Sequence, residues 1–176
     1  MIEPAVFSVA HRNSTRCPEK MTRPFGDTTL TDIVLQKLKV LSATYPVFFA
    51  AHEELFREKA ERWGVPFIRQ SLEASLMGGP ARAIHHYLED VPYEWVLLIN
   101  ASLPFLSIPT IRAFISSATI SGQLRPAFSV VEERDYFLTA EGKAVNFDPT
   151  LSTINTKVVP PLHRFGHALY LFQRQH

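Results

Sequence analysis

The part of the sequence richest in side chains suited to phosphate chemistry is the segment from His11 to Met21. Its first ten residues, His-Arg-Asn-Ser-Thr-Arg-Cys-Pro-Glu-Lys, carry three cations, two hydroxyls and an amide. Arginine and lysine form charge-assisted hydrogen bonds with phosphate oxygens, so this composition predicts a loop that wraps a phosphate chain. The glycine spacings of dinucleotide-binding and P-loop sites do not occur in the segment, which disfavours a Rossmann dehydrogenase.

The overall composition limits what such a loop can bind. The chain has 176 residues, of which 46% are hydrophobic and 20% charged, and its formal net charge is +1. Lysine and arginine are spread along the chain, apart from a local excess at Arg12, Arg16, Lys20 and Arg23. An anion site should therefore be small and local. We expect a nucleotide as the partner, and no nucleic acid.

The composition also indicates a compartment. Cys17 is the single cysteine, which excludes an internal disulfide and a thiolate metal site and suits a reducing cytoplasm. The N-terminal residues lack the basic start of a signal peptide, and no run reaches the roughly 18 apolar residues of a membrane-spanning helix. We therefore expect an unexported, cytoplasmic protein that binds no membrane.

Strand patterns and helix patterns alternate along the chain, and together they must position the loop. Apolar, β-rich runs predict strands at 5–10, 47–51, 66–69, 95–100, 127–132 and 168–172. Apolar residues at helical spacing predict helices near 30–41, 56–63, 80–88 and 111–118. Local signals support them, because Thr29 and Asp32 form a capping box, Gly64 suits a helix C-terminus and Pro80 suits a helix start.

This alternation predicts an α/β fold with three layers, in which helices cover both faces of a mostly parallel central sheet. In such sheets ligands bind beyond the carboxyl ends of the strands, so the loop after the first strand is the expected site. From residue 136 the pattern changes to a β-hairpin excursion, with strands at 136–138 and 144–147, followed by a proline-rich passage to Pro161. We expect residues 1–176 to form a single domain.

The predicted phosphate loop resembles the nucleotide-binding signature of the CMP-sialic acid synthetase family, which has the form R-x-x-S-x-R-x-P-x-K-N. Ser14, Arg16, Pro18 and Lys20 fall on the family's positions. Three later segments resemble the family in the same order. Leu-Ile-Asn-Ala-Ser-Leu-Pro at 98–104 is similar to L-L-Q-P-T-S-P, Ser-Val-Val-Glu at 129–132 matches S-V-V-E, and Arg-Phe-Gly-His-Ala-Leu-Tyr at 164–170 is similar to R-x-N-G-A-I-Y.

Several positions depart from the family's pattern. His11 replaces an arginine, Met21 replaces the asparagine after the loop lysine, and His167 replaces the glycine before the last strand. Ala-His-Glu at 51–53 stands where the family has an acidic pair, and 76–81 lacks the hydroxyls of D-T-A-S-S. The family's metal-holding D-x-D carboxylates follow the last matched strand. We therefore expect the family's C-terminal part to be missing, which puts the metal site in doubt.

The resemblance implies the nucleotide-diphospho-sugar transferase fold and a cytidylyltransferase activity. CMP would be transferred from CTP to a 2-keto sugar acid, sialic acid or a related nonulosonic or octulosonic acid, with release of pyrophosphate. Lys20 and Arg16 would act on the triphosphate as catalytic residues. Arg12, Asn13 and Ser14 would bind neighbouring parts of the nucleotide.

Two further positions follow from the resemblance. Arg69, at the end of the third strand, matches a nucleotide-contacting arginine, and Asn100 stands where a glutamine contacts the sugar acid. The resemblance also implies Mg²⁺ as cofactor and a homodimer, with residues 136–161 as the dimerisation arm.

Other readings of the same residues stay open. Lys20 and Arg16 could be solvated loop charges, Ser14 a turn hydroxyl, and Cys17 an inert filler. A second hypothesis, behind the cytidylyltransferase, is a catalytically degenerate homologue that serves as a nucleotide-binding or interaction module. A third reading is a nucleotidyltransferase of the same fold that uses another NTP.

Overall fold

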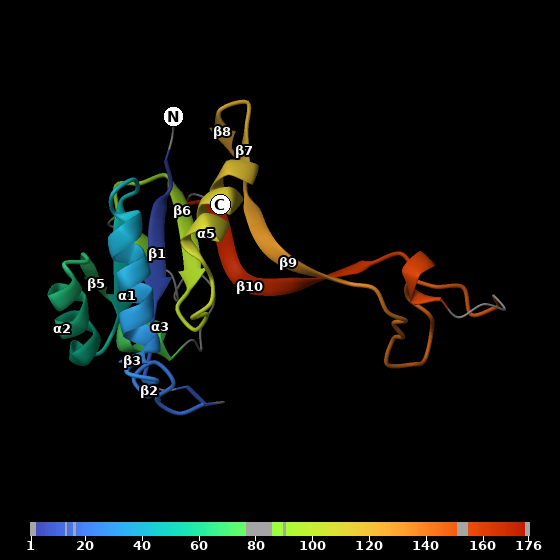
Figure 1. Cartoon of the computed structure of the whole chain (residues 1–176), viewed down its shortest axis with the longest axis horizontal. Helices are drawn as coiled ribbons and strands as arrows, with labels where there is room; N and C mark the ends of the chain where they lie inside the picture. The colour runs from blue at the N-terminus through green and yellow to red at the C-terminus, as the bar shows by residue number, and fades with distance from the viewer. Residues whose placement is uncertain are drawn as a thin grey trace. The chain divides into compact units, whose positions relative to one another are not determined.

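The computed structural model describes residues 3–12, 14–15, 17–76, 86–89, 91–150 and 155–174. In this part of the chain six strands form one sheet in the order β5-β4-β1-β6-β10-β9 (Figure 1). Their bounds are β1 Ala5–Val9, β4 Val47–Ala51, β5 Phe67–Arg69, β6 Trp95–Asn100, β9 Ala127–Glu133 and β10 Leu162–Gln173. The first four pair in parallel, and β10 runs antiparallel to β6. The predicted mostly parallel sheet is therefore confirmed.

The central strands are apolar on both faces because both faces are covered. In β1, Val6 belongs to one buried cluster while Ala5 and Phe7 belong to another on the opposite face. Ser8, also in β1, is a polar residue that is fully buried. Its hydroxyl donates a hydrogen bond to the carbonyl of Ile99 at 2.9 Å. A buried hydroxyl with a partner avoids most of the desolvation cost. The bond also joins β1 to β6 at the centre of the sheet.

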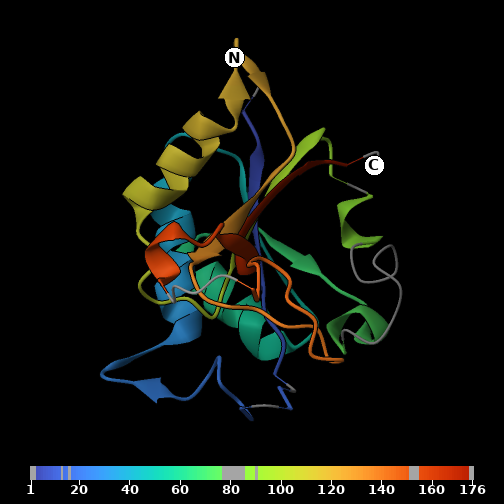
Figure 2. The same ribbon diagram turned by 90° about the vertical axis from the view of Figure 1, so that its right-hand side faces the viewer.

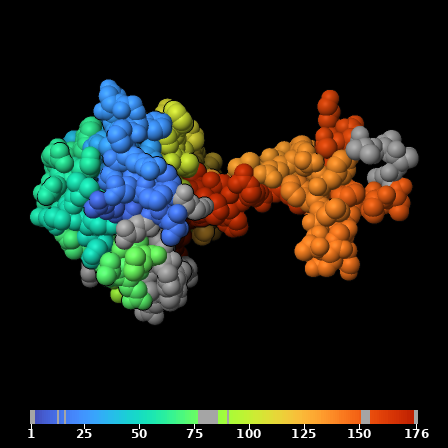
Figure 3. Space-filling model, turned by 90° about the horizontal axis from the view of Figure 1, so that it is seen from below, coloured from blue at the N-terminus to red at the C-terminus, as the bar shows by residue number. Residues whose placement is uncertain are grey.

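Helices lie on both faces of the sheet (Figure 2). One face carries α1 (Leu30–Leu41), α2 (Glu54–Trp63) and α5 (Ile108–Ser117), which share a core with the sheet and form one packed body in Figure 3. The other face carries the short helix α3 (Leu72–Ser75) and the 3₁₀ helix η1 (His86–Leu88). None of the described helices has the length and apolar character needed to cross a membrane.

The local signals for two helices are confirmed. The Thr29 hydroxyl accepts a hydrogen bond from the Asp32 amide and so caps α1, and Gly64 ends α2 in the left-handed conformation with φ of 62°. The predicted helix near 80–88 falls largely outside the described residues. Its last predicted positions, Tyr87 and Leu88, are described and are buried in η1.

The sequence patterns did not predict two small hairpins. They pair β2 (Pro24–Phe25) with β3 (Thr28–Thr29), and β7 (Thr119–Ile120) with β8 (Gln123–Leu124). In the second, Ser121 and Gly122 both have positive φ, 50° and 76°, as a type I′ turn requires. Strands of two residues show no periodicity, so no pattern predicted them.

Contacts within the chain divide it into two units, which are described separately. Unit 1 comprises Met1–Ala127 and Ala168–His176, and unit 2 comprises Phe128–His167. The prediction of a single domain, with 136–161 as a dimerisation arm, stays a prediction.

The hairpin predicted within unit 2 is shorter than expected. In place of two paired strands there is a single antiparallel bridge, Leu138 to Ala144, closed by the turn at 139–142. The Asn146 side chain supplies the hydrogen bonds that a longer strand pair would make. Its Oδ1 accepts the amide of Phe137, and its Nδ2 donates to the carbonyls of Asp135 and Pro160. These backbone groups are thereby satisfied without a longer strand pair. The last strand, by contrast, is longer than predicted, because β10 already begins at Leu162.

Candidate functional site

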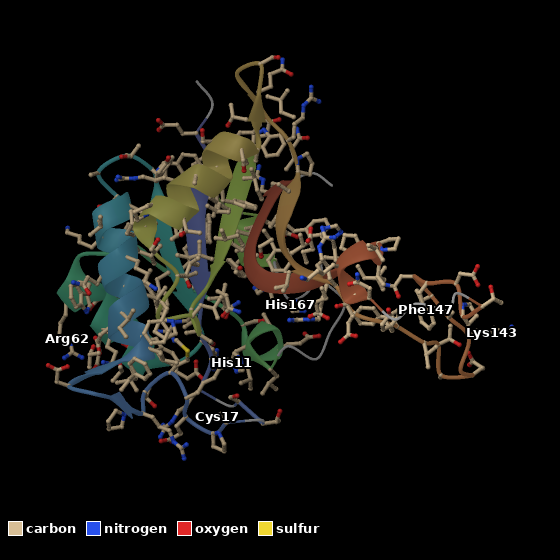
Figure 4. All side chains as sticks on the ribbon, turned by 45° about the vertical axis from the view of Figure 1, so that its right-hand side comes forward. His11, Cys17, Arg62, Lys143, Phe147 and His167 are labelled. Atoms are coloured by element: carbon tan, nitrogen blue, oxygen red, sulfur yellow. The ribbon has the colours of Figure 1, made fainter. Side chains whose placement is uncertain are left out.

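The loops after β1 and β6 lie at the point where the strand order reverses. From β1 the chain passes through α1 to β4 on one side, then to β5, and crosses over to β6 on the other side of β1. In open α/β sheets this switch point opens a crevice beyond the carboxyl ends of the strands, where ligands bind. His11 lies at the end of β1 and Cys17 farther along the loop (Figure 4). The predicted phosphate loop is therefore at the expected edge of the sheet.

The phosphate loop is held by its own backbone and by one strand end. Glu19 is left-handed, with φ of 54°, and its carbonyl accepts the amides of Thr22 and Arg23. The amide of Arg12 donates to Glu53 Oε1 at 2.8 Å, which ties the start of the loop to the end of β4. The Arg12 guanidinium pairs with Glu19 across the loop, at 2.6 Å. An exposed pair of this kind contributes little stability and can open when an anion arrives.

Among the loop cations that the structure describes, Lys20 has the most available charge. Its amide donates to the Cys17 carbonyl, while its ammonium makes no hydrogen bond or ion pair with any residue that the structure describes. Ser14 is buried, and its backbone amide donates to the Arg12 carbonyl; whether its hydroxyl binds a nucleotide or serves the turn stays a prediction. Asn13 and Arg16 lie outside the described residues.

Arg69 and its partners occupy the edge of the sheet beyond β5. Its guanidinium donates to the carbonyl of His52 and pairs with the Glu54 carboxylate. Hydrogen bonds from Arg57 and from Arg69 hold the pKa of Glu54 below its ordinary value. Arg69 thus lies near the predicted nucleotide site but is already engaged, and a ligand would have to compete with this exposed carboxylate.

Asn100 is the last residue of β6 and shapes the loop that follows. Its Oδ1 accepts the amide of Ser102 at 2.9 Å. The Ser102 hydroxyl in turn contacts Met21 Sδ at 3.8 Å, so the loop after β6 adjoins the end of the phosphate loop. The structure therefore brings Asn100 to the same edge of the sheet as Lys20.

Lys37 was missed by sequence reasoning. It projects from α1 and donates to the carbonyls of Leu103 and Pro104 at 2.9 and 2.8 Å. Its partial burial lowers its pKa through desolvation. Because two carbonyls of one loop share a single ammonium, Lys37 holds the loop after β6 against the helix. A lysine on an amphipathic helix gives no signal of this role, since its partners are 66 and 67 residues away in the sequence.

The described residues do not form a resident Mg²⁺ site. They hold no group of three His, Cys, Asp or Glu side chains placed to bind a metal ion. Near the phosphate loop Glu19 is paired with Arg12, and Glu54 with arginines, which leaves Glu53 with a single carboxylate oxygen without a partner among the described residues. Mg²⁺ prefers six oxygen ligands in octahedral geometry. This donor set is too small for that.

Comparison with known proteins now defines the family. The model of the MobA-like NTP transferase domain matches residues 11–173. The chain belongs to this family. The match establishes only this broad family. It does not confirm the resemblance to the CMP-sialic acid synthetase family, which stays a prediction. No curated protein matches the sequence.

Solved structures give the MobA-like NTP transferase its fold. A CMP:2-keto-3-deoxy-manno-octonic acid synthetase complexed with CTP superposes with a TM-score of 0.71 at 12% identity, covering 98% of this chain and 75% of that one. A 4-diphosphocytidyl-2C-methyl-D-erythritol synthase from Anaerococcus prevotii gives 0.66 at 12% identity, covering 99% and 71%. A cytidylyltransferase from Leptospira borgpetersenii gives 0.54 at 21% identity, covering 66% and 49%. The predicted nucleotide-diphospho-sugar transferase fold is confirmed.

Proposed function

We propose that this MobA-like NTP transferase is a cytidylyltransferase that moves CMP from CTP to a 2-keto sugar acid and releases pyrophosphate. The observation that carries the proposal is Lys20, whose ammonium is available on the loop after β1 and which falls on the lysine of the R-x-x-S-x-R-x-P-x-K pattern. The names of three structural neighbours, which describe proteins that make or bind cytidine nucleotides, support cytosine as the base.

The proposed reaction needs charge neutralisation more than covalent help. An anomeric hydroxyl oxygen attacks the α-phosphorus of CTP and forms a new P–O bond. The bond to the bridging β-phosphate oxygen breaks, its electron pair leaves with pyrophosphate, and the hydroxyl proton is released. Lys20 and Arg16 neutralise the triphosphate, while Arg12, Asn13, Ser14 bind nearby nucleotide groups.

Arg69 and Asn100 complete the proposed site. Arg69 contacts the nucleotide once it exchanges Glu54 for a ligand group, and Asn100 faces the sugar acid from the loop that Lys37 holds. Mg²⁺ is expected to arrive bound to the triphosphate, as it commonly does at nucleotide sites, with few protein ligands of its own.

The test is a calorimetric titration with CTP, with and without Mg²⁺. We expect Lys20→Ala to weaken CTP binding about tenfold, which corresponds to ~1.4 kcal/mol. Lys39→Ala removes the same charge from an exposed position on α1 and serves as the matched control. Failure of the unmodified protein to bind any of CTP, UTP, GTP and ATP would exclude the proposal, and preference for another base would replace cytosine.

A screen for pyrophosphate release follows the titration. Sialic acid and 3-deoxy-manno-octulosonic acid are the first acceptors to offer together with CTP. CTP binding without pyrophosphate release from any sugar acid would favour a second function, a nucleotide-binding module without catalysis. The engagement of Arg12 and Arg69 with carboxylates supports that alternative.

We also propose a homodimer in which residues 136–161 of unit 2 act as the arm. The support is the apolar surface of this segment, where Leu138, Val145 and Val158 are exposed and Val158 is 75% exposed. A pocket of about 290 Å³, lined in part by Tyr136 and Phe147, lies in the same unit. Sedimentation velocity should show a dimer that Val158→Lys weakens. A monomer at micromolar concentration would exclude the homodimer.

The cytoplasmic location inferred from the single cysteine stays a prediction.

A further inference from the structure

Two polar side chains at the ends of β4 and β5 have groups that no described residue satisfies. Glu53 uses Oε1 to accept the amide of Arg12, but its buried Oε2 has no hydrogen-bond partner among the described residues. Gln70 is only 1% exposed, and neither its Oε1 nor its Nε2 is bonded to any residue that the structure describes. Leaving a buried polar group unpaired destabilises the folded protein, and more strongly when the group is charged. Such groups therefore call for an explanation.

The two side chains belong to adjacent strand ends. In the β4–β5 register Ala51 lies opposite Arg69, so the residues that follow each of them leave the sheet at the same level. His52 Nδ1 lies 3.1 Å from the Gln70 carbonyl oxygen, which joins these two strand ends directly. Glu53 is also bonded to the first residues of the phosphate loop. The unsatisfied groups thus lie at the ligand-binding edge, beside the loop proposed to hold the triphosphate.

Their chemistry selects the part of a nucleotide that would satisfy them. A carboxylate oxygen only accepts hydrogen bonds, whereas a carboxamide both donates and accepts. Phosphate oxygens are acceptors too, so a phosphate would repel Glu53. Cytosine offers an amino donor at N4 beside the acceptors N3 and O2, and acidic side chains accept from this amino group in nucleic-acid recognition. Uracil presents the O4 acceptor in the same place.

We propose that Glu53 and Gln70 contact the nucleobase, with Glu53 accepting from the cytosine amino group and Gln70 pairing with the remaining base edge. This inference rests on the proposed function and deepens it, because it names the residues that distinguish CTP from UTP. Glu53 is the specificity-determining residue of the pair, since an oxygen that cannot donate disfavours a base with a carbonyl at that position.

Glu53→Gln is the first test, because it preserves shape and gives position 53 a donor. Affinities for CTP, UTP and inorganic triphosphate are measured by calorimetry. We expect the CTP-to-UTP affinity ratio to exceed ten in the unmodified protein and to fall at least about tenfold in the variant. Inorganic triphosphate reports the effect of removing a charge, which the ratio cancels. Glu58→Gln, an exposed position on α2, is the matched control and leaves the ratio unchanged.

Gln70→Leu is the second test and does not depend on the first variant folding. It should weaken CTP about tenfold, leave inorganic triphosphate binding unchanged, and not lower the unfolding temperature of the free protein, because an unpaired buried amide is replaced by an apolar group of similar size. An unmodified protein that binds CTP and UTP equally overturns the inference. So do an unchanged ratio in Glu53→Gln and unchanged CTP binding in Gln70→Leu. Failure of the unmodified protein to bind any nucleotide excludes the proposed function itself.

Discussion

The two units of the chain treat their apolar side chains differently. In unit 1, Phe49 and Phe56 pack edge to face in a core with almost no solvent exposure. In unit 2, Phe128 and Phe165 stack at 4.6 Å, yet both are about half exposed. Unit 1 thus has a large buried core, although Phe105 on its surface is 88% exposed, whereas the described part of unit 2 is held by local hydrogen bonds and keeps many of its large apolar side chains exposed. Stability should therefore be concentrated in the first unit, which also carries the candidate nucleotide site, whereas the second unit is suited to contact another protein chain.

The largest difference is expected from removing one aromatic ring in each unit. Phe49→Ala leaves a cavity in the core of unit 1 and should lower the free energy of unfolding by about 3–5 kcal/mol. Phe165→Ala removes an exposed stacked ring in unit 2 and should cost no more than ~1.5 kcal/mol. Urea denaturation measures both. Equal losses would mean that the ring of Phe165 is covered in the protein as it exists in solution.

A second contrast concerns one ion pair in each unit. In unit 1 Asp32 accepts from Lys59 at 2.6 Å and from the Trp63 indole at 3.2 Å, which joins α1 to α2. Asp32→Asn should cost about 2 kcal/mol, because a partly buried charged group loses its partners. Arg164→Gln breaks the more exposed pair with Glu133 in unit 2 and should cost below ~1 kcal/mol. Comparable losses would contradict the difference between the units.

The Asp32 pair also predicts how stability depends on pH. Burial alone would raise the pKa of Asp32, but hydrogen bonds from Lys59, Thr29 and Trp63 outweigh it and hold the pKa below the ordinary value of 3.8. A lowered pKa in the folded state stabilises the fold above the unfolded value, and this contribution is lost as pH falls through the folded value. The deficit of Asp32→Asn should therefore shrink below about pH 4. Asp27→Asn, in an exposed turn, serves as the control.

The next effect is local to unit 2. Asn146→Ala removes three hydrogen bonds that satisfy backbone groups around the Leu138–Ala144 bridge. It should lower the free energy of local opening by about 1–3 kcal/mol. Hydrogen exchange at the amides of Phe137 and Val145 should accelerate, while the strands of unit 1 keep their protection. Accelerated exchange in β1 and β4 would show that the units unfold together.

The smallest effect is at the residue that ends unit 2. His167 has φ of 51°, a left-handed conformation that costs most residues about 1 kcal/mol and that glycine adopts without strain. His167→Gly should therefore be more stable than His167→Ala by roughly 1 kcal/mol in urea denaturation. If His167→Ala were the more stable variant, the left-handed backbone conformation of His167 would not be a source of strain.

The sequence predicted best where a single local rule decides the structure. The bounds of β4 and β6 were predicted to the residue because both are continuous apolar runs between polar segments. The turn of the excursion in unit 2 was also predicted. The strands predicted at 136–138 and 144–147 are reduced to the single bridge between Leu138 and Ala144, because the Asn146 side chain satisfies backbone groups that a ladder would otherwise pair. No periodicity reveals a side chain in that role.

The position of the candidate site was predicted in outline for a similar reason, while the roles of its residues stay predictions. A cationic loop after the first strand indicated the position, and Asn100 and Arg69 are the last residues of strands whose ends meet at the same edge. Gln70 directly follows β5, and Glu53 lies two residues beyond the end of β4, which was a usable signal. What distinguishes Glu53 and Gln70 is that the Glu53 Oε2 and the Gln70 side-chain amide have no hydrogen-bond partner among the described residues. The sequence cannot show this, because it depends on contacts between residues that are far apart in the chain.

The strand order has a consequence for synthesis on the ribosome. β10 lies between β6 and β9, so β9 has no neighbour in the sheet until the chain has been made beyond residue 162. The parallel strands β5, β4, β1 and β6 need nothing made after Asn100. At roughly 5–20 residues per second, an unpaired β9 waits for seconds with its backbone groups exposed. During that interval the nascent chain exposes an unpaired strand edge, which chaperones or another nascent chain on the same mRNA can bind.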